Sequence, residues 1–540
     1  MKINRATFAP LAVAAFALAT GGWFLQRGAG QERNVYANAQ LFEQVLQYVN
    51  QAFVDEKPPS DLYKMAIDGL LDGLGDPHTA FMPGREYETL RIATQGEYAG
   101  IGVSIAKRNG WVTVITPLPG TPGERVGLQA GDQIIEVDGT STREWTDDEA
   151  VMRLRGPKGT TVNIRVARVG ADQPIAFKIT RDEIRVRSVP ASYLIDNGVG
   201  YVELRVFSES STRELREAIN TLRGQGAKGI ILDMRGNSGG LLDEGSTVSD
   251  LFLETGKPIV ETRGRFQGNT QQMVATDPDE FPGLPIVVLV GPQSASATEI
   301  VAGALQDHDR ALIVGRPTFG KGSVQTVFRL QGGNYLKLTT ARWYTPSGRS
   351  IQRPYDAEHP LADAAETGAG EGGARPEYRT DRGRKVFGGG GITPDVDIAP
   401  DTTTLAERPL IETLQRQNWP KFFETQFAFG VRYKNEHAEL KPGFPITQAM
   451  LDEFYRTLID GGFKIERPTF DAAKRWVSYQ LASQITFSKW GDQERRRREN
   501  ADDQQVRAAI ELLQKATTPE SLFTVAEQYQ GASRRVGASR

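Results

Sequence analysis

The alternation of strand and helix patterns after Asp182 constrains the fold of this chain more than any other feature. Apolar runs of strand length end in glycine-containing turns, and helical patterns lie between them; the runs cover Lys228–Asp233, Leu284–Val290 and Ala311–Gly315. An earlier strand is predicted at Gly198–Phe207. Such β-α-β alternation predicts an α/β core with right-handed crossovers.

The helix that precedes the first of these runs has its own start signal. Ser211-x-x-Glu214 predicts a capping box, in which the two side chains bond to the first backbone N–H groups. The apolar residues that follow at helical spacing are expected to face inward, namely Leu215, Ile219 and Leu222.

Ser296 lies at the turn between the run Leu284–Val290 and a helical pattern whose apolar positions are Ile300, Val301, Ala304 and Leu305. A helix N-terminus offers unpaired N–H groups and a positive dipole end, and both favour the oxyanion that develops in acyl transfer. Serine at a helix start is ordinarily an N-cap, so the position alone does not identify a nucleophile.

A nucleophilic serine needs a base, and histidine is scarce here. The four histidines lie in segments of different character, without metal-site spacing or an obvious role in a Ser-His-Asp triad. Lysine can replace histidine when burial lowers its pKa from about 10.4 towards neutrality. Lys321 lies in a glycine-bracketed turn after Ala311–Gly315, and Gln325 is placed to orient its amine.

At these residues the sequence resembles the carboxyl-terminal processing proteases, also called tail-specific proteases. The family's Ser-Ala-Ser-Ala-x-Glu motif matches Ser294–Glu299. The resemblance implies that Ser296 is the nucleophile, that Lys321 is the base of a Ser-Lys dyad and that Gln325 assists the lysine. It also implies supporting roles, structural or orienting, for Glu299, Asp307 and Thr318.

A second stretch, Asp233–Gly240, reads DMRGNSGG and matches the family's Asp-x-Arg-x-Asn-x-Gly-Gly motif. Glycine lets the backbone approach a ligand closely. The resemblance implies that the amide of Gly239 or Gly240 forms half of an oxyanion hole and that the amide of Ala297 forms the other half. Taken alone, the two glycines are equally typical of a tight turn.

Residues 86–181 read as short strands broken by glycine and proline, and they resemble a PDZ domain. Gly96–Ile105 is similar to its carboxylate-binding loop, where backbone amides hold a peptide C-terminus; these would be the amides of Gly100, Ile101, Gly102 and Val103. Pro119–Gly139 is similar to the domain's second signature. A hairpin turn is the alternative for Gly100–Gly102 alone, and a nucleotide-phosphate loop lacks its sequence context.

The composition excludes several classes of function. A chain of 540 residues is long enough for about three domains. The net charge of −3 argues against nucleic acid as a partner, and the absence of cysteine excludes disulfides, thiol nucleophiles and thiolate metal sites. No cofactor and no metal ion is expected.

Residues 1–30 predict an export signal or membrane anchor. Lys2 and Arg5 precede an apolar stretch from Phe8 to Leu25, and Ala17–Ala19 offers a cleavage-like pattern. The stretch is long enough to remain as an anchor, so cleavage stays open. The protein is expected to be exported, either periplasmic or membrane-anchored and facing outside the cytoplasm.

The sequence pattern changes at the remaining domain boundaries, and the family resemblance supports them. A helical N-terminal segment of the core is expected at 35–83. The protease core is expected at 182–400, with a mobile insertion near 356–378, and a helical domain at 401–540. The expected fold is an α/β core of the ClpP/crotonase-like type with an inserted, mainly-β PDZ domain and an all-helical C-terminal extension.

The extension carries two apolar stripes, one with Met450, Leu451, Phe454, Tyr455, Leu458 and Ile459 and one with Val506, Ile510 and Leu513. The basic run Arg495–Arg498 is expected to be a solvated helix face. Family members with such tails use them to oligomerise or to dock adaptor proteins, so the resemblance implies a homo-oligomer or an adaptor as a partner.

Two functions follow from these observations. The first is an exported serine endopeptidase that recognises unstructured C-terminal tails of proteins through its PDZ domain and cleaves them with the Ser296–Lys321 dyad. The alternative is a catalytically inactive PDZ scaffold on a protease-like core. The presence of Ser296, Lys321 and Gln325 favours the protease.

Overall fold

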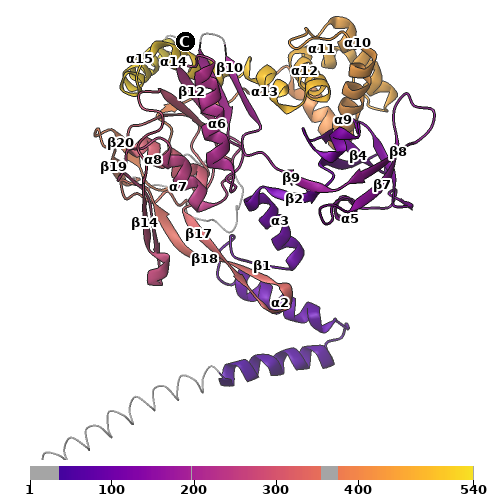
Figure 1. Ribbon diagram of the computed structural model, residues 1–540, viewed down its shortest axis with the longest axis horizontal. Coiled ribbons are helices and arrows are strands. Elements are labelled where there is room, and N and C mark those ends of the chain that lie inside the picture. The colour runs from indigo at the N-terminus through magenta and orange to yellow at the C-terminus, as the bar shows by residue number, and fades with distance from the viewer. Residues whose placement is uncertain (1–35, 196–197, 354–374, 539–540) are drawn as a thin grey trace, which may run out of the picture. The chain divides into compact units, whose positions relative to one another are not determined.

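The computed structural model describes residues 36–195, 198–353 and 375–538 (Figure 1). The predicted export segment 1–30 and most of the insertion near 356–378 lie outside the described residues. The chain divides into two compact units, which we describe separately: Met1–Pro83 with Val327–Thr339, and Gly84–Thr326 with Thr340–Arg540. The domain boundaries given above stay predictions.

The first unit is mainly helical. A helix covers residues 36–52, and α2 covers Pro59–Asp72. The short strand β1, Ala80–Met82, pairs antiparallel with the first residues of β18, which spans Tyr335–Tyr344. In the described part of the whole chain, no helix combines the length and the apolar character needed to cross a bilayer.

A six-stranded sheet forms the centre of the second unit, in the order β10-β11-β12-β15-β16-β21. β10 is antiparallel to β11, and the remaining neighbours are parallel. The strands span Ala191–Ile195, Val199–Glu203, Gly229–Asp233, Ile286–Val290, Leu312–Gly315 and Val396–Asp397. The predicted α/β alternation is therefore confirmed, and the carboxyl ends of the parallel strands meet at one edge of the sheet.

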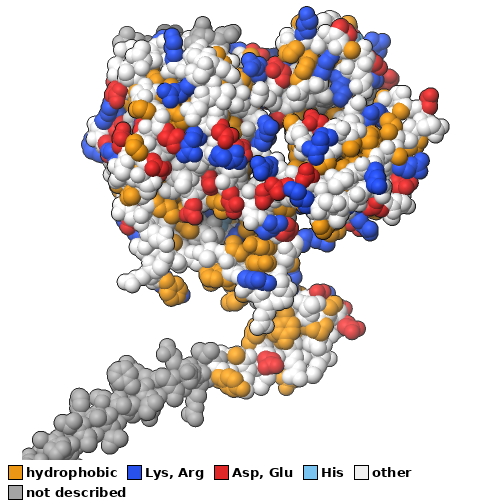
Figure 2. All heavy atoms as spheres, viewed as in Figure 1, with side chains coloured by type: hydrophobic (Ala, Val, Ile, Leu, Met, Phe, Trp, Pro, Cys, Tyr) orange, Lys and Arg blue, Asp and Glu red, His pale blue; other side chains and the backbone are white. Residues whose placement is uncertain are grey.

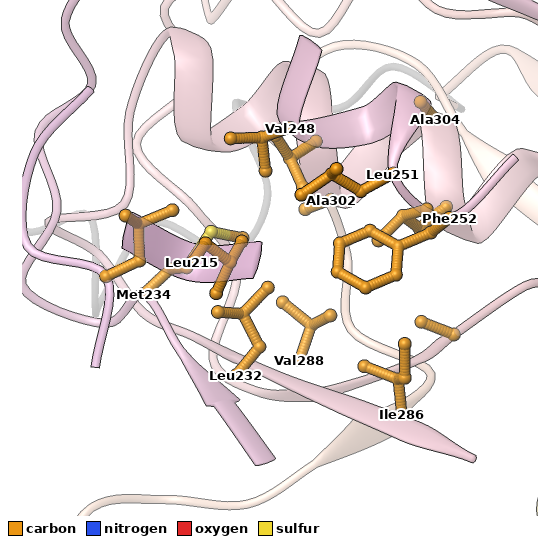
Figure 3. Close-up of a cluster of buried hydrophobic side chains, with 14 of the residues drawn as sticks. Leu215, Leu232, Met234, Val248, Leu251, Phe252, Ile286, Val288, Ala302 and Ala304 are labelled. Carbon is orange, nitrogen blue, oxygen red and sulfur yellow. The ribbon is translucent and has the colours of Figure 1, made fainter. Parts of the chain in front are cut away.

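Helices cover both faces of this sheet because successive strand residues point to opposite sides. Leu232, Ile286 and Val288 pack on one side against α6, α7 and α8, which span Ser211–Gly224, Leu242–Asp250 and Ala297–Asp307 (Figure 3). Ile231, Val287 and Leu289 pack on the other side against α14 and α15, Gln504–Lys515 and Pro519–Ala538. The last helices of the chain thus complete the core of the sheet.

The predicted start of α6 is only partly right. Leu215, Ile219 and Leu222 are buried, as expected from their spacing. The capping box, however, is wrong: Ser210 occupies the N-cap position, and no side chain caps the helix. The Ser211 hydroxyl instead donates to the Val206 carbonyl at 3.0 Å.

The PDZ-like region forms a separate antiparallel sheet in the order β3-β4-β5-β7-β8, with β6 paired to β5. Its strands are Val103–Arg108, Trp111–Pro117, Gln133–Val137, Thr140–Ser141, Thr161–Ala167 and Ile175–Thr180, and its helices are α4, Pro122–Arg125, and α5, Asp147–Leu154. The pair β2 and β9, Glu97–Gly100 with Asp182–Arg185, connects this region to the rest of the chain after α3, Gly84–Gln95.

Further strands form sheets separate from the central one. β13, Pro258–Gly264, pairs with β14, Gln271–Val274, and with the end of β18. β17, Ser323–Arg329, also pairs with β18. β19, Glu377–Arg379, pairs with β20, Lys385–Phe387. β17 matters for function because it follows the turn that contains Lys321.

Five helices precede α14 in the chain: α9 to α13, at Arg408–Glu436, Gln448–Asp460, Arg467–Ala472, Lys474–Trp490 and Asp492–Asn500. The first four, α9 to α12, share an apolar cluster of their own. Met450, Leu451, Phe454 and Leu458 are buried there as predicted, whereas Ile459 is exposed. In the second stripe Val506 and Leu513 are buried and Ile510 is partly buried.

The basic run Arg495–Arg498 differs from the expectation of a solvated face. Arg496 binds Glu203 of β11, Arg495 binds Asp492 and Glu499, and Arg498 donates to the Phe444 carbonyl. The charge of these residues is used in contacts within the protein. Over the face shown in Figure 2, Lys and Arg side chains are interspersed with Asp and Glu, in keeping with the small net charge.

Candidate active site

Ser296 occupies the turn between β15 and α8, at the N-cap position of the helix. Its backbone has φ +58° and ψ −118°, although an N-cap residue ordinarily adopts a β-region conformation. A positive φ at a residue other than glycine costs about 1–3 kcal/mol and occurs at sites where the surrounding structure enforces it. Nucleophilic serines on strand-to-helix turns adopt such strained geometry.

The turn before Ser296 is fixed by the hydroxyl of Ser294. This hydroxyl donates to the Met234 carbonyl at 2.8 Å and accepts the N–H of Gly291 at 3.0 Å. Ser294 is fully buried, so both bonds are shielded from water. The first serine of the predicted motif is therefore a structural residue that joins the turn to the end of β12.

Glu299, in the first turn of α8, connects the segments that carry Ser296 and Lys321. One carboxylate oxygen accepts the N–H of Ser296 at 2.8 Å and the N–H of Lys321 at 2.9 Å. The other accepts the N–H of Gly320 at 2.7 Å and the hydroxyl of Thr318 at 2.5 Å. Because Glu299 has 0 % exposure, these four bonds form a rigid buried frame.

Burial raises the pKa of the Glu299 carboxyl above its ordinary value, and the hydrogen bonds from Thr318, Lys321, Ser296 and Gly320 offset only part of this rise. All four partners donate to the carboxyl, and all four donating groups are uncharged: three backbone amides and one hydroxyl. The frame is therefore held by neutral donors alone.

The turn that carries Lys321 is held on both sides of this residue. Its N–H is bound by Glu299, and its carbonyl accepts the indole N–H of Trp343 at 3.1 Å. The next amide, that of Gly322, donates to the side chain of Gln352 at 2.8 Å. Lys321 is half-buried, which suits an amine that is presented to a ligand from a fixed backbone.

Gln325 lies four residues after Lys321, in the strand β17. Its side-chain amide donates to the hydroxyl of Ser323 at 2.9 Å, and like Lys321 it is half-buried. Its predicted role beside the lysine stays a prediction. Thr318 lies at the centre of the frame, since its hydroxyl also accepts the N–H of Ile392 at 2.6 Å.

The glycine loop after β12 lies against the Ser296 turn. Asn237, fully buried, donates from its side chain to the Leu204 carbonyl and accepts the N–H of Gly239 at 2.8 Å. Its carbonyl accepts the N–H of Ala295 and the hydroxyl of Thr298. A single buried side chain and its backbone thus join three segments.

Gly239 and Gly240 differ in what their amides can do. The Gly239 amide is engaged by Asn237, whereas within the described residues the Gly240 amide donates to no hydrogen-bond acceptor. A Cβ on Gly239 would lie 3.1 Å from the amide nitrogen of Ala297 and 2.8 Å from the Cβ of Ser296. A side chain there would fill the space beside the serine, so glycine is required.

Asp307 lies at the opposite end of α8 from Ser296, about 16 Å away at a helical rise of about 1.5 Å per residue. Its carboxylate binds Arg349 at 2.6 Å, and both side chains are almost fully buried. It also accepts the N–H of Ser347 at 3.0 Å. Asp307 therefore stabilises the far end of the helix and is not placed to touch a substrate at Ser296.

The predicted carboxylate loop of the PDZ-like region lies beside the edge strand β3. Gly102 has φ +72°, and a Cβ there would come within 2.3 Å of Thr121. The carbonyls of Ile101 and Gly102 accept the N–H of Gly123 and the hydroxyl of Thr121. These bonds fix the loop from inside. Among the described strands β3 pairs only with β4, so it forms an edge of this sheet, and the N–H of Lys107 donates to the side chain of Asp147 at 2.7 Å.

Two residues near the site had no predicted role. Asn237 lies within the motif DMRGNSGG, so the motif itself is the signal that pointed to it. Trp343 lies in an ordinary strand pattern, and no feature of the sequence connects it with Lys321. Among the described residues, no His, Asp and Glu side chains are grouped in a way that could hold a metal ion.

Two family models match the chain. The model of peptidase family S41 matches residues 198–357, and the PDZ domain model matches residues 89–167. The first match contains Ser296, Lys321, Gln325 and the glycine loop. The second contains the loop Gly100–Val103.

Curated relatives agree with these matches. The chain is 41 % identical over 325 residues to a carboxy-terminal-processing protease of Bartonella bacilliformis, covering 59 % of this chain and 74 % of that protein. It is 37 % identical over 336 residues to a carboxyl-terminal-processing protease of Picosynechococcus, covering 58 % of this chain and 80 % of that protein.

A photosystem II D1 C-terminal processing protease of known structure is 28 % identical, and the match covers 66 % of this chain and 86 % of that one, with a TM-score of 0.35. That degree of superposition is low, so the assignment rests on the relatives in sequence. The chain belongs to the carboxyl-terminal processing proteases, the serine-type peptidases of family S41.

Proposed function

We propose that this protein is an exported endopeptidase that captures unstructured C-terminal tails of proteins on its PDZ domain and cleaves them with a dyad of Ser296 and Lys321. The observation that carries the proposal is the shared carboxylate of Glu299, which binds the backbone N–H groups of both residues. This common buried anchor supports the proposal because it fixes the backbones of the two residues relative to each other, and a nucleophile and its base require a fixed mutual geometry.

The proposed reaction begins with a neutral Lys321 amine. It takes the proton of the Ser296 hydroxyl as the serine oxygen attacks the carbonyl carbon of the scissile bond. The oxyanion is bound by the amides of Gly240 and Ala297, the latter at the N-terminus of α8. Lys321 then gives the proton to the leaving amine, and water hydrolyses the resulting ester by the same route.

Gln325 is proposed to orient the Lys321 amine, and Glu299 and Thr318 to hold the backbone around it. In the PDZ domain, the amides of the loop Gly100–Val103 would bind the terminal carboxylate while the peptide adds to the edge of β3. We also propose a core of the ClpP/crotonase-like type and, from the leading segment of the sequence, a location outside the cytoplasm. An adaptor or a homo-oligomer stays a proposal from the family alone.

The alternative, a catalytically inactive PDZ scaffold, would have no need of the strained backbone at Ser296. Non-catalytic relatives would be free to relax this turn, because strain of about 1–3 kcal/mol persists only where the fold enforces it. The φ of +58° at Ser296 therefore favours the enzyme.

The test is cleavage of a disordered peptide with a free apolar C-terminus by wild type, Ser296→Ala and Lys321→Ala. Each substitution is expected to lower kcat/KM by at least about 1000-fold, and the double variant no further, because the two groups act as one unit. Circular dichroism and thermal unfolding should match wild type. More than a tenth of wild-type activity in Lys321→Ala would remove the lysine from the mechanism.

The same assay with a peptide amidated at its C-terminus tests the PDZ part. Amidation removes the charge that the loop amides are proposed to hold, and KM is expected to rise about tenfold, an effect typical of losing one charge-assisted contact. Equal cleavage of both peptides would show that the loop does not read the carboxylate, while leaving the dyad in place.

A further inference from the structure

Arg235 lies in the turn between β12 and the glycine loop, and its guanidinium connects the loop to the end of the chain. Its Nε and Nη2 donate to the buried carboxylate of Asp233, the latter at 2.6 Å. Its Nη1 donates to Asp503 at 2.6 Å and to the side chain of Gln505 at 2.8 Å. Arg235 thus uses its planar fork to bind two elements at once.

The α14 side of this contact is rigid. One oxygen of Asp503 caps the helix, accepting the N–H groups of Gln505 at 2.8 Å and Val506 at 3.1 Å, while the other oxygen binds Arg235. The side chain of Gln505 also donates to the Ile398 carbonyl at 2.6 Å. Because the apolar face of α14 is part of the core of the sheet, the acceptors of Arg235 are held in place.

Neighbouring charges strengthen the connection. Glu203, at the end of β11, binds Arg496 of α13 at 3.0 Å, and Arg205 binds Asp492 at 2.7 Å. These contacts lie at the carboxyl ends of β11 and β12, which is the edge of the sheet where the glycine loop starts. The C-terminal helices therefore bind the sheet at its functional edge as well as across its face.

The turn that carries Arg235 leads directly to the site. Asn237 donates its N–H to the carbonyl of Met234, and its side chain holds the amide of Gly239. Gly239 in turn lies close enough to Ser296 and Ala297 that a single added carbon would collide with them. A displacement of the Arg235 turn would thus be passed to the amide of Gly240.

We propose that Asp503 and Gln505 are positioning residues for catalysis: through Arg235 they hold the loop Asn237–Gly240, so the C-terminal extension sets the geometry of the oxyanion hole. This inference rests on the proposed function. It extends the site to helices that lie outside residues 198–357, the stretch matched by the peptidase model.

Asp503→Asn isolates this role, since asparagine caps a helix as well as aspartate does but cannot form the ion pair. The matched control is Asp502→Asn, the adjacent residue, whose carboxylate is 81 % exposed and pairs with Arg507. Both variants are measured as the full chain, by kcat and KM on the free-acid tail peptide and by thermal unfolding.

In Asp503→Asn, kcat is expected to fall about five- to tenfold with KM within about twofold, because a misplaced oxyanion donor weakens only the transition state. Asp502→Asn should match wild type. The Arg235→Lys variant keeps a cation beside Asp233 but lacks the guanidinium that binds Asp503. When Asp503→Asn is added to Arg235→Lys, kcat should fall by less than about twofold.

Equal kcat in Asp503→Asn and Asp502→Asn would overturn the inference, as would a loss of kcat of the same size in both backgrounds. A lowered melting temperature with unchanged kcat would assign Asp503 a purely structural role and overturn it too. These outcomes are distinct from failure of the proposed function, in which Ser296→Ala would cleave as well as wild type.

Discussion

Two buried carboxylates, Glu299 and Asp233, bind the two halves of the site, and their surroundings are opposite in kind. Glu299 is surrounded by neutral donors on the core itself, and burial raises its pKa. Burial also acts to raise the pKa of Asp233, but the charge and hydrogen bonds of Arg235 outweigh it and hold the pKa below its ordinary value.

The difference shows how each half of the site depends on the rest of the chain. In the half with Ser296 and Lys321, the buried carboxylate of Glu299 binds only groups of the core: the amides of Ser296, Gly320 and Lys321 and the hydroxyl of Thr318. The half with Gly239 and Gly240 is proposed to be fixed by two ion pairs of Arg235, one with Asp233 and one with Asp503 at the start of α14. Salt weakens ion pairs that are partly exposed to solvent, whereas it does not weaken buried hydrogen bonds from neutral donors.

The largest effect that separates the two halves is expected for Glu299→Gln. Each carboxylate oxygen accepts a backbone N–H, so either orientation of the glutamine amide sets an NH2 group against a backbone donor. We expect kcat/KM to fall about 100-fold and the free energy of unfolding to fall by about 2–4 kcal/mol. Peptide cleavage and urea unfolding measure the two losses.

Glu407→Gln is the control, because Glu407, at the N-cap of α9, is also buried and accepts the N–H of Thr404, and its carboxylate pairs with Arg475 far from the site in sequence. It should lower the stability but leave kcat/KM within about twofold. A Glu299→Gln variant with full activity would show that the frame is not needed to place Ser296 and Lys321.

A smaller effect concerns the pH dependence of stability. The pKa of Glu299 is raised in the folded protein. Its protonation therefore contributes to the free energy of unfolding completely below its ordinary pKa of 4.5, and this contribution is lost as pH rises through the folded pKa. The pKa of Asp233 is lowered in the folded protein. Its ionised carboxylate therefore contributes to the free energy of unfolding above its ordinary pKa of 3.8, and this contribution is lost as pH falls through the folded pKa.

The difference in unfolding free energy between wild type and each variant, measured from about pH 3 to 7, should therefore change in opposite directions for the two variants, by at most about 1.4 kcal/mol per pH unit. The deficit of Glu299→Gln relative to wild type should narrow as pH rises, and the deficit of Asp233→Asn should widen. Parallel slopes would contradict the contrast between the two carboxylates.

The α/β core was predictable from sequence because its strands are apolar throughout and end in glycine turns, as in Ile286–Val290 before Gly291. Helix α6 was predictable from Leu215, Ile219 and Leu222, which repeat at helical spacing. The capping box was not, because the Ser211 hydroxyl accepts the N–H of Ser208 in place of a helix N–H and also bonds to the hydroxyl of Ser188. Ser188 is brought there by tertiary structure, which a local motif does not contain.

The candidate site was predictable only in part. The motifs around Ser296, Lys321 and Gly239 are short and local, so these residues can be identified from the sequence. The contacts that join them, such as the indole of Trp343 on the Lys321 carbonyl, depend on pairing between distant strands. Arg495–Arg498 misled because a charge run gives no sign of partners such as Glu203, which lies far earlier in the chain.

The most direct test of the central claim, that Lys321 is the base for Ser296, is the pH dependence of kcat/KM with the free-acid tail peptide. A protonated lysine cannot accept the serine proton, so kcat/KM should rise through a single ionisation between about pH 6 and 9, well below the ordinary lysine value of about 10.4. Gln325→Ala should lower the rate by misplacing the amine. A profile that is flat, or that falls with rising pH while the protein stays folded, would contradict a lysine base.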